Sequence, residues 1–193
     1  MNMSSSLYEF AFRGLLAEEG LDRAGRMHPN LVGALDEEYA QRMGIELLDE
    51  QFVVSARQMA VVYMAITAFE NSVRKFISTV LFEKAGEDWW TNAVSANIKK
   101  KVESRQKEEE KVRWHTQRGA LPITYTDMGD LGNIMRNSWQ HFEAYIPSIE
   151  WANSLLDIVE RSRNVIMHSG YLGREDVERV GMNIRDWIKQ VGT

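Results

Sequence analysis

Several common catalytic frameworks are missing from this sequence of 193 residues. It has no cysteine, so it can form neither a disulfide framework nor a metal site with thiolate ligands, and a reducing compartment suits it. A glycine-rich phosphate loop, a nucleophile elbow, a paired-histidine zinc motif and strand-like alternation are absent too. These absences argue against a Rossmann enzyme, a P-loop enzyme and a zinc hydrolase.

A membrane span and a signal peptide are also not indicated. The longest nearly uncharged run, residues 51–66, contains Arg57 and has amphipathic spacing. Residues 1–4 lack the basic-then-apolar pattern of a signal peptide. We therefore expect a cytoplasmic protein without a membrane partner.

An excess of basic charge is lacking, because 23 Lys and Arg residues face 28 Asp and Glu residues, for a net charge of -5. This balance argues against a protein coated for general nucleic-acid binding. The distribution is uneven, however, with eight basic against four acidic residues between Lys99 and Arg118. That stretch has few large apolar residues, which is typical of a solvated or partly disordered arm, and it would supply phosphate attraction if RNA is bound.

The sequence is rich in helical periodicity. Apolar residues at steps of three and four predict a central helix over residues 48–82, with Met59, Val62, Ile66, Phe69, Val73, Phe76 and Val80 on one face. A second stripe, from Val177 to Val191, predicts a last helix that opens at Arg174. With 44% hydrophobic residues, the chain can bury an ordinary core, and we expect an all-α fold.

The chain is expected to divide into two parts. Residues 1–49 are interpreted as an accessory helical segment, with one helix from about Leu7 to Gly20 and another around Leu31 to Tyr39. Residues 50–193 are interpreted as a helical bundle. Within it, the pair Trp89-Trp90 is expected to anchor a turn in the core.

Two acidic residues in the middle of the predicted bundle segment have two possible interpretations. Asp127 and Asp130 are three residues apart, and metal binding is one reading of them, but helix capping explains them adequately, with Thr126 or Asp127 as the N-cap. We therefore expect no metal and no cofactor. Apolar spacing also predicts a further helix that carries Ile134, Trp139, Phe142 and Ile146.

Three side chains suited to phosphate chemistry lie close together near the end of the chain. Ser148 is the expected N-cap of a helix that runs to a stop at Gly170. On that helix, Asn164 and His168 share a face, whereas Arg163 and His168 are about 140° apart around the axis. A second copy of the helix, related by a two-fold axis, would bring the two together, which favours a homodimer.

The spacing Arg163-Asn164-x-x-x-His168 resembles the R-N-x-x-x-H motif of the HEPN family, whose members are helical bundles and in many cases metal-independent endoribonucleases of toxin, antiviral and RNA-processing systems. The order of residues 124–134, 139–142 and 163–168 resembles that of the branch related to a yeast nuclear RNA-surveillance endonuclease, and residues 68–77 resemble it too. The resemblance covers about residues 50–190. It implies an antiparallel HEPN-type bundle with an N-terminal helical extension.

The resemblance also implies a function, which is metal-independent cleavage of RNA in a toxin or antiviral defence system. A ribose 2′-hydroxyl would attack its own phosphodiester at a composite site in a homodimer cleft. His168 would act as general base or acid, and Arg163 would hold the phosphate. Asn164 would bind the phosphate or fix His168. Glu70, four residues before Arg74, would be the orienting carboxylate, unless the two form only a surface ion pair.

Further contacts with RNA are expected from basic side chains on phosphates and from one tryptophan stacked on an exposed base. These candidates are Arg74, Lys99, Lys100, Lys101, Arg105 and Trp114. The expected partners are RNA, a second copy of the chain, and an antitoxin or effector protein.

The alternative is a non-catalytic HEPN module for dimerisation or partner docking. Each motif residue has a structural reading, since Arg163 could pair with Glu160, Asn164 could face solvent and His168 could cap the helix. A third reading is an enzyme of the same fold that modifies nucleotides or is held inactive by an antitoxin.

Overall fold

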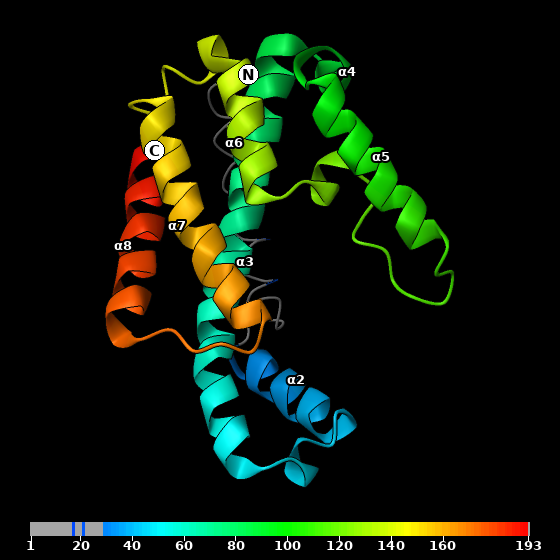
Figure 1. The fold of residues 1–193 in the computed structure, drawn as a ribbon, viewed down its shortest axis with the longest axis vertical. Helices are drawn as coiled ribbons and strands as arrows, with labels where there is room; N and C mark the ends of the chain where they lie inside the picture. Colours follow the sequence, from blue (N-terminus) through cyan, green and yellow to red (C-terminus); the bar gives the residue numbers. More distant parts are fainter. Residues whose placement is uncertain (1–16, 18–20, 22–28, 193) are drawn as a thin grey trace, which may run out of the picture. The chain divides into compact units, whose positions relative to one another are not determined.

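The structure is a computed structural model, and it describes residues 17, 21 and 29–192, with the side chains of residues 29–35 left aside. The described residues form seven α-helices and three short 3-10 helices, and they contain no strand (Figure 1), which confirms the all-α prediction. The α-helices are α2 (Pro29–Arg42), α3 (Glu50–Ala85), α4 (Trp89–Ala93), α5 (Ala96–Glu110), α6 (Met128–Asn137), α7 (Ile149–Met167) and α8 (Arg174–Val191). The 3-10 helices are η2 (Ile45–Leu47), η3 (Pro122–Tyr125) and η4 (Trp139–His141).

The chain divides into two compact units, residues 1–54 and residues 55–193. In the first unit, α2 lies where the sequence predicts a second helix, and Gly44, with a φ of 61°, turns the chain from α2 into η2. The first predicted helix, from about Leu7 to Gly20, lies outside the described residues apart from Ala17. The predicted domain boundary after residue 49 stays a prediction.

Helix α3 is the central helix that the apolar stripe predicts, and it is the longest helix of the described residues. Its buried face contributes Ile66, Phe69, Val73, Ile77, Val80 and Leu81 to the core. By length and apolar composition, α3 could also cross a membrane. It is the one helix in the described part of the chain that meets these two criteria. A core helix has the same character, so this is weak evidence, and the expectation of no membrane partner stays a prediction.

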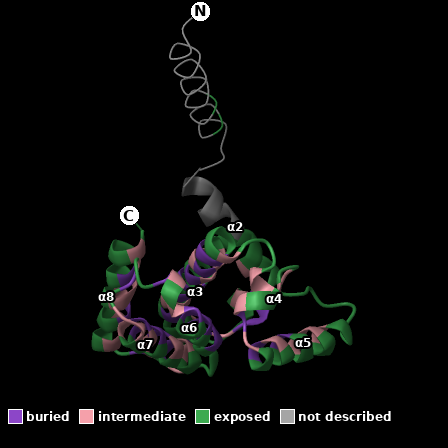
Figure 2. Cartoon of the chain, turned by 90° about the horizontal axis from the view of Figure 1, so that it is seen from above, coloured by how far each residue is buried: buried purple, intermediate pink, exposed green. Residues whose placement is uncertain are grey.

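The second unit is built around α7, which packs between α6 and α8 (Figure 1). Buried residues of these helices and of α3 form one hydrophobic core, and Figure 2 marks the buried segments along the chain. Trp187 of α8 joins the layers, because its ring stacks on Trp151 at 5.9 Å between centroids and meets Phe69 edge-on at 5.9 Å. The predicted last helix and its stripe correspond to α8.

Helix α5 projects from the side of this bundle (Figure 1). Ser95 caps its start by accepting a hydrogen bond from the Ile98 amide at 3.4 Å, and Ile98 and Val102 are buried at its base. Trp89 and Trp90 pack against the core just before it, as predicted. The arm is therefore a helix fixed at its base, and the reading of it as partly disordered is wrong for residues 96–110.

The helix predicted to carry Trp139, Phe142 and Ile146 is not formed. Ser138 leaves the helical conformation at φ -119° and ψ 31°, and only a short 3-10 turn follows. Ser138 is buried and donates to the Ala93 carbonyl at 3.4 Å, which anchors the chain where the helix ends. Phe142 and Ile146 are still buried, so the apolar spacing identified the core residues but not the secondary structure.

Candidate functional site

The Arg-Asn-His motif lies at the end of α7, with Arg163 and Asn164 in its last turns and His168 at its C-cap. Ser148 is the N-cap, as predicted, and accepts from the Trp151 amide at 3.1 Å. Ser162 is buried, Arg163 is half-buried, and Asn164 and His168 are exposed. Within the described residues, the side chains of Asn164 and His168 make no hydrogen bond. The helix thus presents two unengaged polar groups beside a partly sheltered guanidinium.

Helix α7 ends at Met167 rather than at the predicted stop, Gly170. The left-handed residue that ends it is Ser169, with a φ of 60°, and the Gly170 amide then donates to the Val165 carbonyl at 2.8 Å. A Cβ on Gly170 would lie 2.7 Å from that carbonyl oxygen, so glycine is needed there for close approach. His168 is consequently the C-cap, and its backbone leaves the helix at this position.

Glu70 links the central helix to the motif. It is buried on α3, ion-pairs with Arg74 one turn along the same helix, and places its Oε2 3.6 Å from Nε of Arg163. The pair with Arg74 is therefore not a surface pair, since the two side chains are only 9% and 14% exposed. No hydrogen bond or ion pair within the described residues joins Glu70 to His168. The carboxylate lies where it can orient Arg163.

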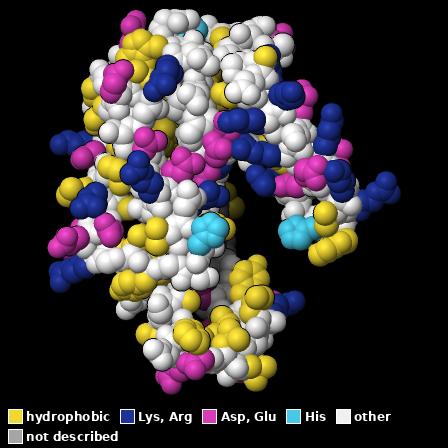
Figure 3. All heavy atoms as spheres, viewed as in Figure 1, with side chains coloured by type: hydrophobic (Ala, Val, Ile, Leu, Met, Phe, Trp, Pro, Cys, Tyr) yellow, Lys and Arg dark blue, Asp and Glu magenta, His cyan; other side chains and the backbone are white. Residues whose placement is uncertain are grey.

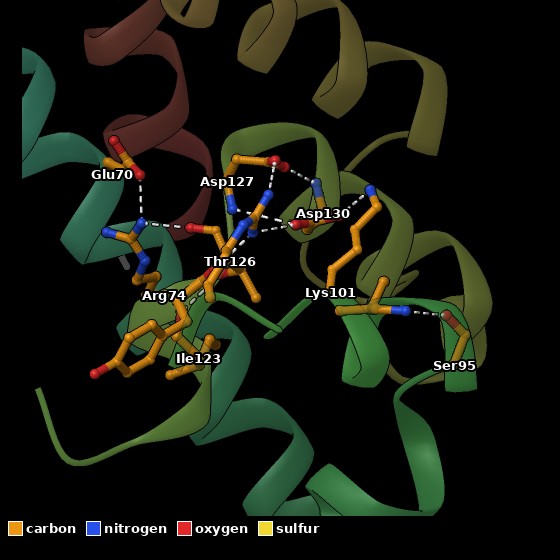
Figure 4. Close-up of polar contacts among 11 residues, drawn as sticks. Glu70, Arg74, Ser95, Lys101, Ile123, Thr126, Asp127 and Asp130 are labelled. Atoms are coloured by element: carbon orange, nitrogen blue, oxygen red, sulfur yellow. Dashed lines mark hydrogen bonds and ion pairs between the residues drawn. The ribbon is translucent and has the colours of Figure 1, made fainter. Parts of the chain in front are cut away.

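Arg74 connects this carboxylate to the segment before α6 (Figure 4). One terminal nitrogen donates to Glu70 and, at 2.8 Å, to the Thr126 carbonyl, and the other donates to Asn71 at 3.0 Å. Its Nε is buried and has no partner among the described residues. These contacts suit a residue that positions Glu70, and the expected contact of Arg74 with RNA stays a prediction.

A second polar cluster fixes α5 to the start of α6 (Figure 4). Asp127 and Asp130 form a capping box, in which the Asp130 amide donates to Asp127 at 2.7 Å. Asp130 is fully buried and receives Lys101 Nζ and an Arg105 terminal nitrogen, each at 2.9 Å, while Arg105 also reaches Asp127 at 2.7 Å. Of the two readings of these aspartates, the structure therefore shows helix capping. Figure 3 shows the basic and acidic side chains lying side by side where α5 leaves the bundle.

The pKa values in this cluster follow from its hydrogen bonds. Burial alone would raise the pKa of Asp130, but the hydrogen bonds from Lys101 and Arg105 outweigh it and hold the pKa below its ordinary value. The hydrogen bond to Asp130 in turn raises the pKa of Lys101. Asp130 is therefore an ionised buried anchor at neutral pH.

The remaining substrate-binding candidates lie along α5 and beyond it. Lys99 donates to the Thr91 carbonyl at 2.9 Å, Lys100 is exposed, and Trp114 is 86% exposed in the loop after α5, edge-on to His115. Lys101 and Arg105 form ion pairs with Asp130 and Asp127, so these two residues have a structural role. Roles of these five residues in RNA binding stay predictions.

Arg163 borders a cavity of about 520 Å³ between α3, α5, α7 and the segment around Thr126. Its wall includes Glu70, Arg74 and Arg105, which brings residues from distant parts of the sequence to one place. His168 does not line this cavity. A single copy of the chain therefore gathers the guanidinium and carboxylate groups, and leaves the imidazole outside.

Comparison with known proteins bears on the meaning of this motif. The family model of the Swt1-like HEPN domain matches residues 64–192, which is more than half of the chain. The chain belongs to the Swt1-like HEPN family. HEPN domains are commonly ribonucleases, and Glu70, Arg163, Asn164 and His168 all fall inside the matched HEPN span. No curated protein and no solved structure matches the chain.

One acidic residue near Arg163 and Glu70 was not among the predicted catalytic residues. Glu160, one turn before Arg163 on α7, lies over Gly129 at the start of α6. Burial raises its pKa, and the charges of Asp127, Asp157 and Glu70 raise it further, against the opposing effect of Arg163. The sequence shows Glu160 beside the motif, but the approach of Asp127 depends on how α6 packs on α7.

Asp130→Asn should destabilise the protein strongly at neutral pH, because it leaves Lys101 and Arg105 without their buried partner. We expect a loss of about 3 kcal/mol in the free energy of unfolding, or roughly 6–12 °C in melting temperature. The stabilisation from a depressed pKa is present above the unfolded pKa and is lost as the pH falls through the folded one. Thermal melts of the two proteins should therefore converge in acid.

The matched control is Asp176→Asn, which breaks an exposed ion pair with Arg179 and should cost less than about 0.5 kcal/mol. Equal losses from the two variants would contradict the anchoring role of Asp130.

Glu160→Gln should have the opposite effect and stabilise the protein modestly at neutral pH. A raised folded pKa means that ionised Glu160 opposes folding above that pKa, and that this cost disappears once the carboxyl is protonated. The gain in melting temperature should shrink as the pH is lowered through the raised pKa. The control is Glu143→Gln, at an exposed carboxylate with no ion pair among the described residues. It should leave the melting temperature unchanged both at neutral pH and at the lower pH. A stabilised Glu143→Gln protein would contradict the interpretation that burial and nearby charges make Glu160 unfavourable.

Proposed function

We propose that this HEPN protein is a metal-independent endoribonuclease that works as a homodimer. The observation that carries the proposal is the placement of Arg163 in a Swt1-like HEPN chain. Glu70 ion-pairs with Nε of Arg163, and the Arg163 guanidinium borders a polar cavity. Asn164 is exposed on the same helix, and His168 is exposed at its C-cap. Kinship with RNA-surveillance endonucleases, which the sequence predicts, agrees with this reading.

The proposed reaction uses only groups of RNA and protein. The ribose 2′-oxygen attacks the adjacent phosphorus, the bond from phosphorus to the 5′-oxygen breaks, and a 2′,3′-cyclic phosphate and a 5′-hydroxyl result. His168 would take the 2′ proton or supply a proton to the leaving 5′-oxygen, since imidazole exchanges protons readily near neutral pH. Arg163 would hold the non-bridging phosphate oxygens as charge develops on them, and Asn164 would hydrogen-bond the phosphate or His168.

A second copy of the chain would complete the site, because a single copy keeps the Arg163 guanidinium and the His168 imidazole apart. Arg163 lines the cavity and His168 does not, so a composite site needs the imidazole of a partner or a rearrangement of the helix end. An exposed apolar face of α3, made by Ala60, Val61, Met64, Ala65 and Ala68, follows directly around the helix from the cavity-lining residues Tyr63 and Thr67. Its position favours this face as the two-fold interface.

The wider role that we propose is that of a cytoplasmic toxin or antiviral defence nuclease, controlled by an antitoxin or effector protein. The alternative, a non-catalytic module for dimerisation or docking, would use the same α3 face, so the presence or absence of cleavage decides between them.

His168→Ala should abolish cleavage, with a loss of about a hundredfold or more in rate, because a general acid–base group is removed. Wild type and variant are incubated with total cellular RNA in EDTA, and the fragment ends are analysed for cyclic phosphate. The control is His141→Ala, which removes an imidazole from η4, before the start of α7. This variant should cleave RNA like wild type. A wild type that forms dimers and leaves RNA intact would favour the docking module.

Met64→Asp should break the dimer, because a carboxylate would be buried at the interface without a partner. We expect dimer affinity to fall about a hundredfold and cleavage to fall with it, measured by light scattering and by the same RNA assay. The matched control is Met182→Asp on α8, where the methionine is similarly exposed at 54% against 60%. A dimeric Met64→Asp protein would place the interface elsewhere.

A further inference from the structure

The cavity beside Arg163 has a wall dominated by charge, and most of that charge is positive. Its charged lining residues are Glu70, Arg74, Arg105, Arg118, Asp127 and Arg163. Four guanidinium groups thus face two carboxylates in a chain whose net charge is -5. The volume of about 520 Å³ lies in the range of small-molecule sites, so the cavity can admit a nucleotide-sized anionic group.

Two of the four arginines are held in the same way. Arg163 turns its Nε toward Glu70 at 3.6 Å, and Arg118 turns its Nε toward Glu109 at 2.7 Å. Within the part of the chain that the structure describes, the terminal nitrogens of these two side chains make no hydrogen bond. A guanidinium that is ion-paired at Nε and whose terminal groups make no hydrogen bond offers the fork that binds phosphate oxygens in pairs.

The other two arginines are engaged and form part of the wall itself. Arg74 donates to the Thr126 carbonyl at 2.8 Å, and Arg105 donates to the Tyr125 carbonyl at 2.6 Å as well as to Asp127 and Asp130. Their terminal nitrogens already have protein partners. They keep the wall rigid and positive, while Arg118 and Arg163 are the groups with donors to offer.

We propose that Arg118 forms a second phosphate-binding site, which takes a phosphate next to the scissile one on the same RNA strand. The proposal rests on the proposed function, in which Arg163 takes the scissile phosphate. Arg118 comes from the loop after α5 and lies with its guanidinium 5.8 Å from the centre of the Tyr125 ring, and its side chain is 54% exposed. It is therefore both oriented and reachable.

This assignment gives the loop after α5 a specific function. The second phosphate would be bound inside the cavity by Arg118, rather than by the lysines of α5. Recognition of two adjacent phosphates would make the protein select a strand over a mononucleotide without reading its bases.

The test measures binding of ligands that cannot be cleaved, using the full chain. One ligand is a 2′-O-methyl dinucleotide with a single internal phosphate, and the others carry one added terminal phosphate, at the 5′ or at the 3′ end. Wild type should gain about tenfold in affinity from the added phosphate at one of the two ends. Arg118→Gln should lose that gain and bind the single-phosphate ligand as wild type does.

The matched control is Arg113→Gln, an exposed arginine of the same loop that does not line the cavity. It should keep the tenfold gain. A longer 2′-O-methyl strand should show a salt dependence of binding whose slope falls by about 0.7 in Arg118→Gln, as expected when one phosphate contact is lost.

Several outcomes would overturn the site: no gain from either terminal phosphate in wild type, a full gain in Arg118→Gln, or an equal loss in Arg113→Gln, which would indicate diffuse attraction. Should Arg118→Gln fail to fold, Arg118→Lys carries the test, since it keeps the charge and removes the fork; a reduced gain supports the site and a full gain overturns it. The binding assay is independent of cleavage. An Arg118-dependent gain in a protein that never cuts RNA would sink the proposed nuclease and leave the phosphate site standing.

Discussion

One buried carboxylate, that of Glu70, holds together the part of the molecule on which the site depends. It lies on the core helix α3 between the guanidinium groups of Arg74 and Arg163. Removing a carboxylate from water is costly unless cations compensate for the lost hydration, and here two of them do. Arg74 extends the linkage to the Thr126 carbonyl, so that α3, α7 and the segment before α6 meet at a single anion. The direction of Arg163 is thus tied to the core.

The aspartates before and within α6 provide the matching constraint on the other side of the cavity. Asp127 and Asp130 cap α6 and also bind Arg105, which fixes the base of α5 to the bundle. The same two residues therefore begin one helix and place another. Arg105 lies at this junction, Arg118 lies in the loop after α5, and both line the cavity. The positive charge that the arm brings to the cavity therefore comes from these two side chains.

Much of the fold follows from local patterns in the sequence. The stripes of α3 and α8 and the caps at Ser148 and Asp127 are encoded within a few residues, and the structure has them where the sequence predicts them. The failures have non-local causes. Ser138 ends a helix through a bond to Ala93, 45 residues away, and nothing in the spacing of Phe142 and Ile146 reveals it.

The sequence predicts the residues of the candidate site, and their roles stay predictions. The spacing of Glu70 and Arg74 indicates a pair, but only packing shows that the pair is buried and reaches Arg163. The raised pKa of Glu160 and the cavity contact of Arg118 depend on Asp127 and on the loop after α5, which sequence spacing cannot bring together.

The end of α7 has a consequence for how the protein would lose its site. His168 is held on one side by the last turn of the helix and on the other by a short link to α8, in which Tyr171 donates to Gln58 at 3.1 Å and the Leu172 amide approaches the Met59 sulfur at 3.3 Å. Helix ends and exposed links open with much smaller free energies than a core does. Fraying of this one turn would carry the imidazole away while Glu70 and Arg163 stay in place. The candidate site would therefore be lost before the fold is.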